Sequence, residues 1–110
     1  MKTAKAKGQR ASKEVRDLLL TTFQDLEEED IRVTPSGVSG VDILLSPKAQ
    51  SRIPLDIEVK NQENVSIWKW LEQAKKNAKA GTPVVVFRKN SQKLHICLEF
   101  NSFLALLRKS

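Results

Sequence analysis

The sequence predicts a single α/β domain in which a mixed central sheet is flanked by helices. The chain has 110 residues, 40% of them hydrophobic and 29% charged, which is enough for one modest core but not for two. Segments of helical period alternate with short apolar runs typical of strands, in the order α-β-β-β-α-β-β-α. The chain shows neither a membrane-spanning apolar run nor the apolar core of a secretory signal, so we expect an intracellular protein, in the cytoplasm or nucleoid, or in the host cell if it is viral.

The N-terminal third begins with a basic stretch and continues as an amphipathic helix. Residues 1–10, MKTAKAKGQR, are polar and without period, which predicts a mobile basic arm ahead of a domain formed by residues 11–110. From Ser12 onward, apolar residues recur at three- and four-residue spacing, so we expect a helix with Ser12 as its N-cap that ends within the acidic block of residues 25–30. A short strand should follow over residues 31–34 and a turn over residues 35–37.

The middle of the chain carries two predicted strands. Residues 41–45 form a short β run, and residues 54–60, PLDIEVK, form the next, with a polar turn at residues 46–48 between them. This spacing favours a hairpin or meander. Because side chains alternate along a strand, the second run separates an apolar face from a polar one that carries Asp56, Glu58 and Lys60. The polar face is either exposed to solvent or part of a functional site. We expect Asp56 to have a structural role.

The C-terminal half begins with a second helix over residues 67–78, with Ser66 as its N-cap and Gly81 just beyond its end. Residues 82–87 are nearly all apolar, as in strands covered on both faces, and a further strand over residues 94–98 and a helix over residues 103–107 end the chain. Trp68 and Trp70 lie about 200° apart around the second helix. One should therefore be buried and the other exposed at a partner surface, for which a second copy of the chain is the first choice.

Charge is unevenly distributed along the sequence. The net charge is +6, and the basic residues crowd the N-terminus and residues 69–93, with the acidic block between them. Such segregation gives one surface a positive field suited to a phosphate backbone. A simple solubilising surface is the alternative.

Two carboxylates and a lysine fall on neighbouring predicted strands. Asp42 begins one strand, and Glu58 and Lys60 lie two residues apart on the next. If the strands pair antiparallel, the two carboxylates meet and require a cation between them; Mg²⁺ fits, Mn²⁺ could replace it, and the backbone carbonyl of Val59 could add a ligand. Lys60 would then stabilise the charge on an attacked phosphate, so the set indicates phosphodiester hydrolysis. An exposed ion pair on the strand face is the alternative.

These residues resemble a known signature. Asp42, a gap of fifteen residues and then Glu58-Val59-Lys60 is similar to the D…(D/E)-x-K motif of the PD-(D/E)XK nuclease superfamily, although Val41 stands where the superfamily name has proline. The resemblance implies a restriction-endonuclease-like α-β-β-β-α-β core. Residues 7–15, KGQRASKEV, resemble the opening of archaeal-type Holliday junction resolvases, and this likeness implies that Glu14 is a third catalytic acid.

The resolvase likeness implies a magnesium-dependent endonuclease that cuts four-way junctions symmetrically as a homodimer, in DNA recombination and repair. Its partner would be branched double-stranded DNA. Two alternatives remain: a nuclease of the same fold acting on other DNA, in restriction, repair or nicking, and a catalytically inactive DNA-binding relative. Either serine of the loop over residues 35–40 could contribute to the site. The expected DNA contacts are Lys5, Lys7, Arg10, Lys13, Ser36, Ser39, Gln73 and Lys76.

Overall fold

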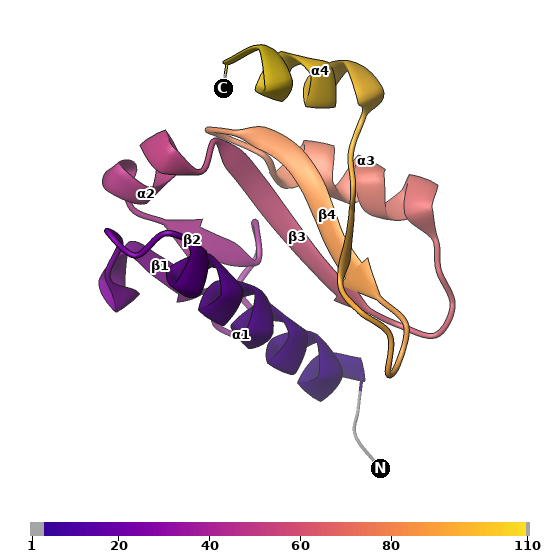
Figure 1. Cartoon of the computed structure of the whole chain (residues 1–110). Helices are drawn as coiled ribbons and strands as arrows, with labels where there is room; N and C mark the ends of the chain where they lie inside the picture. The colour runs from indigo at the N-terminus through magenta and orange to yellow at the C-terminus, as the bar shows by residue number, and fades with distance from the viewer. Residues whose placement is uncertain (1–3, 110) are drawn as a thin grey trace.

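A computed structural model describes residues 4–109 as a small layered α/β structure (Figure 1). The elements are, in chain order, α1 (Ala4–Thr22), a 3-10 turn η1 (Glu28–Asp30), β1 (Ile31–Val33), β2 (Ile43–Leu45), α2 (Pro47–Arg52), β3 (Leu55–Asn61), α3 (Ile67–Asn77), β4 (Thr82–Arg88), β5 (His95–Cys97) and α4 (Phe100–Lys109). This order contains every predicted helix and strand. It confirms an α/β fold consistent with a restriction-endonuclease-like core.

The strands form a mixed three-stranded sheet and a separate antiparallel pair. β3 and β4 run parallel, with Leu55 opposite Thr82, and β5 returns antiparallel to β4. The pair is made by β1 and β2. Figure 1 shows α1 in front of β3, with α3, the crossover between β3 and β4, behind the sheet. β3 is therefore sandwiched between two helices, and both of its faces are removed from water.

The core divides along these two faces. On the α1 side, Ala11 and Val15 of α1 belong to one buried cluster with Ile57 of β3 and Val84 of β4. On the α3 side, Val85 packs in a second cluster that holds Trp70 and Ala74. Adjacent residues of β4 thus face opposite clusters, as strand geometry requires.

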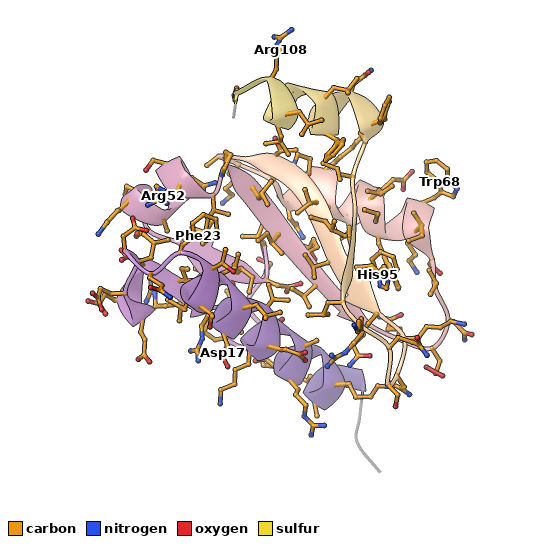
Figure 2. All side chains as sticks on the ribbon, viewed as in Figure 1. Asp17, Phe23, Arg52, Trp68, His95 and Arg108 are labelled. Atoms are coloured by element: carbon orange, nitrogen blue, oxygen red, sulfur yellow. The ribbon has the colours of Figure 1, made fainter. Side chains whose placement is uncertain are left out.

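The two tryptophans of α3 differ as predicted. Trp70 is 3% exposed, whereas Trp68 is 82% exposed and projects from the outer end of α3 (Figure 2). The prediction that one is buried and the other exposed is confirmed. No helix of the described residues is both long and apolar enough for a membrane span.

The first helix starts earlier and ends sooner than the sequence predicted. α1 begins at Ala4, so residues 4–10 are helical where an irregular arm was expected, and residues 1–3 of that arm lie outside the described residues. The reason is propensity: most residues of this stretch are Ala, Lys, Gln or Arg, which are good helix formers. Ser12 is not an N-cap but a buried residue inside the helix, 4% exposed. The helix ends at Thr22, ahead of the acidic block.

The predicted turn between β2 and β3 is also wrong. The Ser46 hydroxyl accepts a hydrogen bond from the backbone N–H of Ala49 at 3.1 Å, and Pro47 occupies the first turn, so the segment starts α2. With a helix between them, β2 and β3 do not form a hairpin, and β2 pairs with β1 instead. Proline after a serine N-cap is a helix-start signal that the sequence already contained.

Candidate active site

The Asp42 carboxylate is fixed against the middle of β3. At the base of the loop before it, the Thr34 N–H donates to the Asp42 carbonyl at 2.9 Å, and the Thr34 hydroxyl donates to the Val41 carbonyl at 2.6 Å. Gly40 turns the chain at a φ of 110°, which disfavours any other residue. The Asp42 N–H then donates to the Ile57 carbonyl at 3.0 Å, and its Oδ2 accepts from the Val59 N–H at 2.8 Å. The acid therefore meets β3 through these two bonds, without the strand pairing that the sequence suggested.

Glu58 is a buried carboxylate that faces α3. Glu58 is only 2% exposed, which excludes the alternative that it belongs to an exposed ion pair on the strand face. Its Oε1 accepts a hydrogen bond from the Asn77 side-chain amide at 2.8 Å. Burial raises the pKa of Glu58 from 4.5 to about 7; the charge of Asp42 and a hydrogen bond with Asp42 add to the rise, while the Asn77 hydrogen bond and the Lys60 charge oppose it. The Asp42 carboxylate is thus close enough to disfavour ionisation of Glu58.

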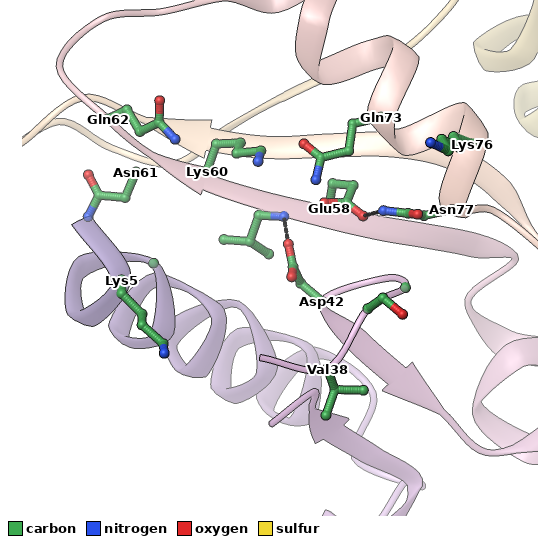
Figure 3. Close-up of a pocket in the computed structure, with 14 residues that line it drawn as sticks. Lys5, Val38, Asp42, Glu58, Lys60, Asn61, Gln62, Gln73, Lys76 and Asn77 are labelled. Carbon is green, nitrogen blue, oxygen red and sulfur yellow. Dashed lines mark hydrogen bonds between the residues drawn. The ribbon is translucent and has the colours of Figure 1, made fainter. Parts of the chain in front are cut away.

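A cavity of about 630 Å³ opens between β3, the start of α1 and the end of α3 (Figure 3). It contains Asp42, Glu58 and Lys60 together, as the sequence predicted, and Val59 also lies on its wall. The other lining residues are mostly polar: Lys5, Gly8, Val38, Ser39, Gly40, Asn61, Gln62, Gln73, Lys76 and Asn77. A carboxylate pair therefore lies in a hollow rimmed by lysines from three elements.

The structure brings only part of the predicted DNA-contacting set to this cavity. Lys5, Ser39, Gln73 and Lys76 line it, so Ser39 rather than Ser36 is the loop serine next to the acids. The others are not among the lining residues. Lys7 is half-buried in α1, Ser36 is exposed in its turn, and Arg10 and Lys13 line two shallow hollows on the outer side of α1.

Glu14 is likewise not a lining residue of the cavity. Its Oε2 forms an ion pair with Arg88 Nη1 at 2.7 Å, and its side chain is 44% exposed. The helical repeat explains the separation, because Lys5 and Gly8 share one side of α1 at three-residue spacing, and Glu14 lies on a different side. A catalytic role for Glu14 stays a prediction without support from this geometry.

Two asparagines of the cavity were missed in the sequence. Asn77 could have been found, because it stands four residues after Gln73 and one after Lys76 and so shares their face of α3. Asn61 directly follows Lys60, and its Oδ1 is buried without a hydrogen-bond partner among the described residues. A buried acceptor of this kind is normally satisfied by water or a ligand, which the adjoining cavity can supply.

The donor set of the cavity fits a hard divalent cation. Asp42 and Glu58 supply carboxylate oxygens and Val59 could supply a carbonyl, while nitrogen and sulfur ligands are absent from the lining residues. Among residues 4–109 there is no group of three acidic, histidine or cysteine residues that could hold a metal. Two carboxylates in an open cavity match magnesium, which usually takes one or two carboxylates and completes its shell with water and phosphate oxygens.

The fold and the cavity together define a class. A PD-(D/E)XK nuclease has an acid at the start of one strand, an acid-x-lysine run on a buried strand and a polar open cavity on a restriction-endonuclease-like core. This structure has all of these features. In agreement, residues 3–110 match a protein family described as "Phage putative PDDEXK endonuclease". The match spans nearly the whole chain, so the chain belongs to this family of nucleases, whose superfamily generally uses divalent metals. Comparisons with curated proteins and with solved structures found no match.

Proposed function

We propose that the chain is a magnesium-dependent endodeoxyribonuclease that hydrolyses phosphodiester bonds of branched DNA, four-way junctions in particular. The observation that carries the hydrolytic part is the convergence of Asp42, Glu58 and Lys60 on one open cavity. A catalytically inactive DNA-binding relative would gain nothing from keeping a buried glutamate with a raised pKa beside a second carboxylate.

The two carboxylates are oriented before any ligand binds. The Val59 N–H holds Asp42 and the Asn77 amide holds Glu58, so neither side chain has to be ordered at the moment of reaction. With Val59, these acids would hold the metal, which when bound supplies charge neutralisation at the phosphate and a lower pKa for water. A cation there would also offset the burial and the Asp42 charge, which together raise the pKa of Glu58.

The remaining cavity residues act on the DNA. Lys60 lies in the hollow, where its ammonium can stabilise the extra negative charge that develops on the phosphate oxygens as water attacks and the P–O bond to the leaving oxygen breaks. Lys5 and Lys76, from opposite sides of the cavity, would bind flanking phosphates, and Gln73 could donate to a phosphate oxygen. The net charge of +6 favours encounter with the polyanion.

The preference for four-way junctions rests on the resemblance of KGQRASKEV to the resolvase opening and on the prediction of a homodimer with two symmetric sites. Gly8 of this segment lines the cavity, as does Lys5 just ahead of it, which is compatible with this proposal. Other branched or linear DNA is the competing substrate class.

A paired cleavage assay tests the proposal. The protein is incubated with a labelled four-way junction or with linear duplex of the same sequence, in Mg²⁺ or in EDTA. We expect symmetric nicks in the junction only, and their loss in EDTA. Lys60→Ala should lower the cleavage rate by about 10²–10³-fold, the usual effect of removing one group that stabilises transition-state charge.

Lys48→Ala is the matched control, because Lys48 lies on α2, donates to the Asp25 carbonyl at 2.9 Å and lies outside the cavity lining. It should cleave like the unchanged protein. Equal cutting of junction and duplex would replace the junction proposal by a general DNA nuclease. Tight DNA binding without cleavage in any divalent metal would reject hydrolysis.

A further inference from the structure

The last helix of the fold leaves most of its described surface exposed. α4 is ten residues long, and none of its described residues is buried. Figure 1 shows it at the edge of the molecule, beyond α3 and the sheet. Helices shorter than about 12–15 residues are marginal in water, and in proteins they are stabilised by packing of an amphipathic face. A contact beyond those made within the described residues would therefore stabilise the helix.

The apolar stripe of α4 faces solvent. Its large hydrophobic residues follow the i, i+3, i+4, i+7 spacing of one helix face: Phe100, Phe103, Leu104 and Leu107, which are 70%, 42%, 44% and 55% exposed. Ser102 and Leu106 lie on the other side of the helix and are the partly buried residues. An ordinary surface helix has the reverse orientation, with its apolar stripe toward the core.

An apolar groove adjoins this stripe. A hollow of about 510 Å³ separates α3 from α4, and Ile67, Trp68, Leu71 and Phe100 are among the residues that line it. Trp68 and the stripe together are called the α4 face. At 150–250 Å² for each aromatic side chain, the exposures of Trp68, Phe100 and Phe103 leave roughly 300–500 Å² of aromatic surface in water. A patch of that size is comparable with the largest apolar patch of a typical monomer, and such patches are often functional.

We propose that the α4 face binds a second copy of this chain, with the two α4 helices packed antiparallel about a twofold axis. The charges at the ends of the helix favour this occupant and this direction. Glu99 directly precedes the helix and Glu72 lies on the groove, whereas Arg108 and Lys109 occupy the last turn. Arg108 points outward in Figure 2.

Antiparallel packing brings the basic last turn of each helix to the acidic residues beside the start of the other helix, namely Glu72 and Glu99, of which Glu99 also pairs with Lys75 of its own chain at 3.2 Å. Parallel packing would place like charges together. The aromatic surface, the exposed leucines and the groove walls approach the roughly 800 Å² that each partner buries in a standard interface.

The interface leaves the cavity of the candidate active site open. On α3, Gln73, Lys76 and Asn77 face that cavity, whereas Trp68, Leu71, Glu72 and Lys75 line the groove on another side of the helix. The dimer would therefore carry two accessible cavities. The inference does not depend on the proposed nuclease activity, because it concerns a separate surface.

Sedimentation equilibrium of the full chain tests the proposal over a wide concentration range. We expect a species of twice the 12.4 kDa chain mass. Leu104→Glu should weaken dimerisation by at least about 30-fold, because it places an unpaired charge at the centre of the contact. Trp68→Glu should do the same from a different helix. Leu18→Glu is the matched control, since Leu18 is 54% exposed on α1 and away from the α4 face.

Three results would overturn the proposal. They are a monomer at every concentration, equal weakening by Leu104→Glu and Leu18→Glu with circular dichroism showing both folded, and a monomer that binds anionic lipid vesicles through Trp68.

Disulfide trapping then tests the direction of helix packing in a Cys97→Ser background. Leu104→Cys, near the middle of the stripe, should link two copies, whereas Arg108→Cys should not link to itself. Self-linking at position 108 would reject the antiparallel arrangement.

Discussion

Replacing Glu58 by glutamine should stabilise the metal-free protein at alkaline pH. The side chain is buried, and its pKa is raised from 4.5 to about 7 by burial, with Asp42 adding to the rise. Folding therefore favours the protonated acid. Its contribution to stability is fully present below about pH 4.5 and is lost as the pH rises through about 7. Above that range the protein holds an unfavourable buried charge, which glutamine lacks.

The size of the effect follows from the pKa. At 1.36 kcal/mol for each pKa unit, a rise from 4.5 to about 7 corresponds to roughly 3 kcal/mol. We expect Glu58→Gln to exceed the unchanged protein by about that amount at pH 8 in EDTA and to differ little at pH 5. Glutamine keeps an oxygen that can accept the Asn77 hydrogen bond, so the substitution preserves the local packing.

Urea unfolding at the two pH values, followed by circular dichroism, measures the difference. Glu99→Gln is the control, because Glu99 is 57% exposed in an ion pair and should change stability by no more than about 1 kcal/mol at either pH. A Glu58→Gln protein that is no more stable than its parent at pH 8, or equally shifted at pH 5 and pH 8, would refute the reasoning.

Three further predictions concern the metal site and the loop that Asp56 binds. Magnesium at pH 8 should raise the urea midpoint of the unchanged protein but not that of Glu58→Gln, since only a site with both acids intact binds the ion well. Asp56→Ala should lower the free energy of unfolding in urea by about 2–4 kcal/mol. The reason is that the buried Asp56 carboxylate accepts hydrogen bonds from the backbone N–H groups of Lys79, Ala80 and Gly81 at 2.5, 3.1 and 2.9 Å. Unchanged stability would contradict that role. Gly81→Ala should lower the free energy of unfolding by about 1–3 kcal/mol in the same measurement, because an added Cβ would lie 2.8 Å from the Leu55 carbonyl carbon. Unchanged stability would show that the loop can shift.

The structural role expected for Asp56 is confirmed by those three hydrogen bonds. Asp56 and Glu58 occupy the same face of β3, yet one closes a loop and the other lines the cavity. Strand alternation placed both on that face but could not assign their partners, because the partners come from residues about twenty positions away in the chain.

The sequence by itself determined the order of the elements apart from α2, the alternation of β3 and the grouping of two acids with a lysine. These features depend on local periodicity and on residue chemistry, which neighbouring positions carry. Where local signals competed, single elements were predicted wrongly. The Ala- and Lys-rich start of α1 was predicted to be irregular, and the Ser46-Pro47 helix start was predicted to be a turn.

Only the tertiary structure decided which chemistry those residues can do. Burial between α1 and α3 shifts the pKa of Glu58, and Asn77 from the far end of α3 orients it. Local sequence patterns likewise could not predict the ion pair of Glu14 with Arg88 or the exposure of the apolar stripe of α4. Desolvation, charge proximity and packing depend on distances through space between remote segments, and a pattern read along the chain does not contain those distances.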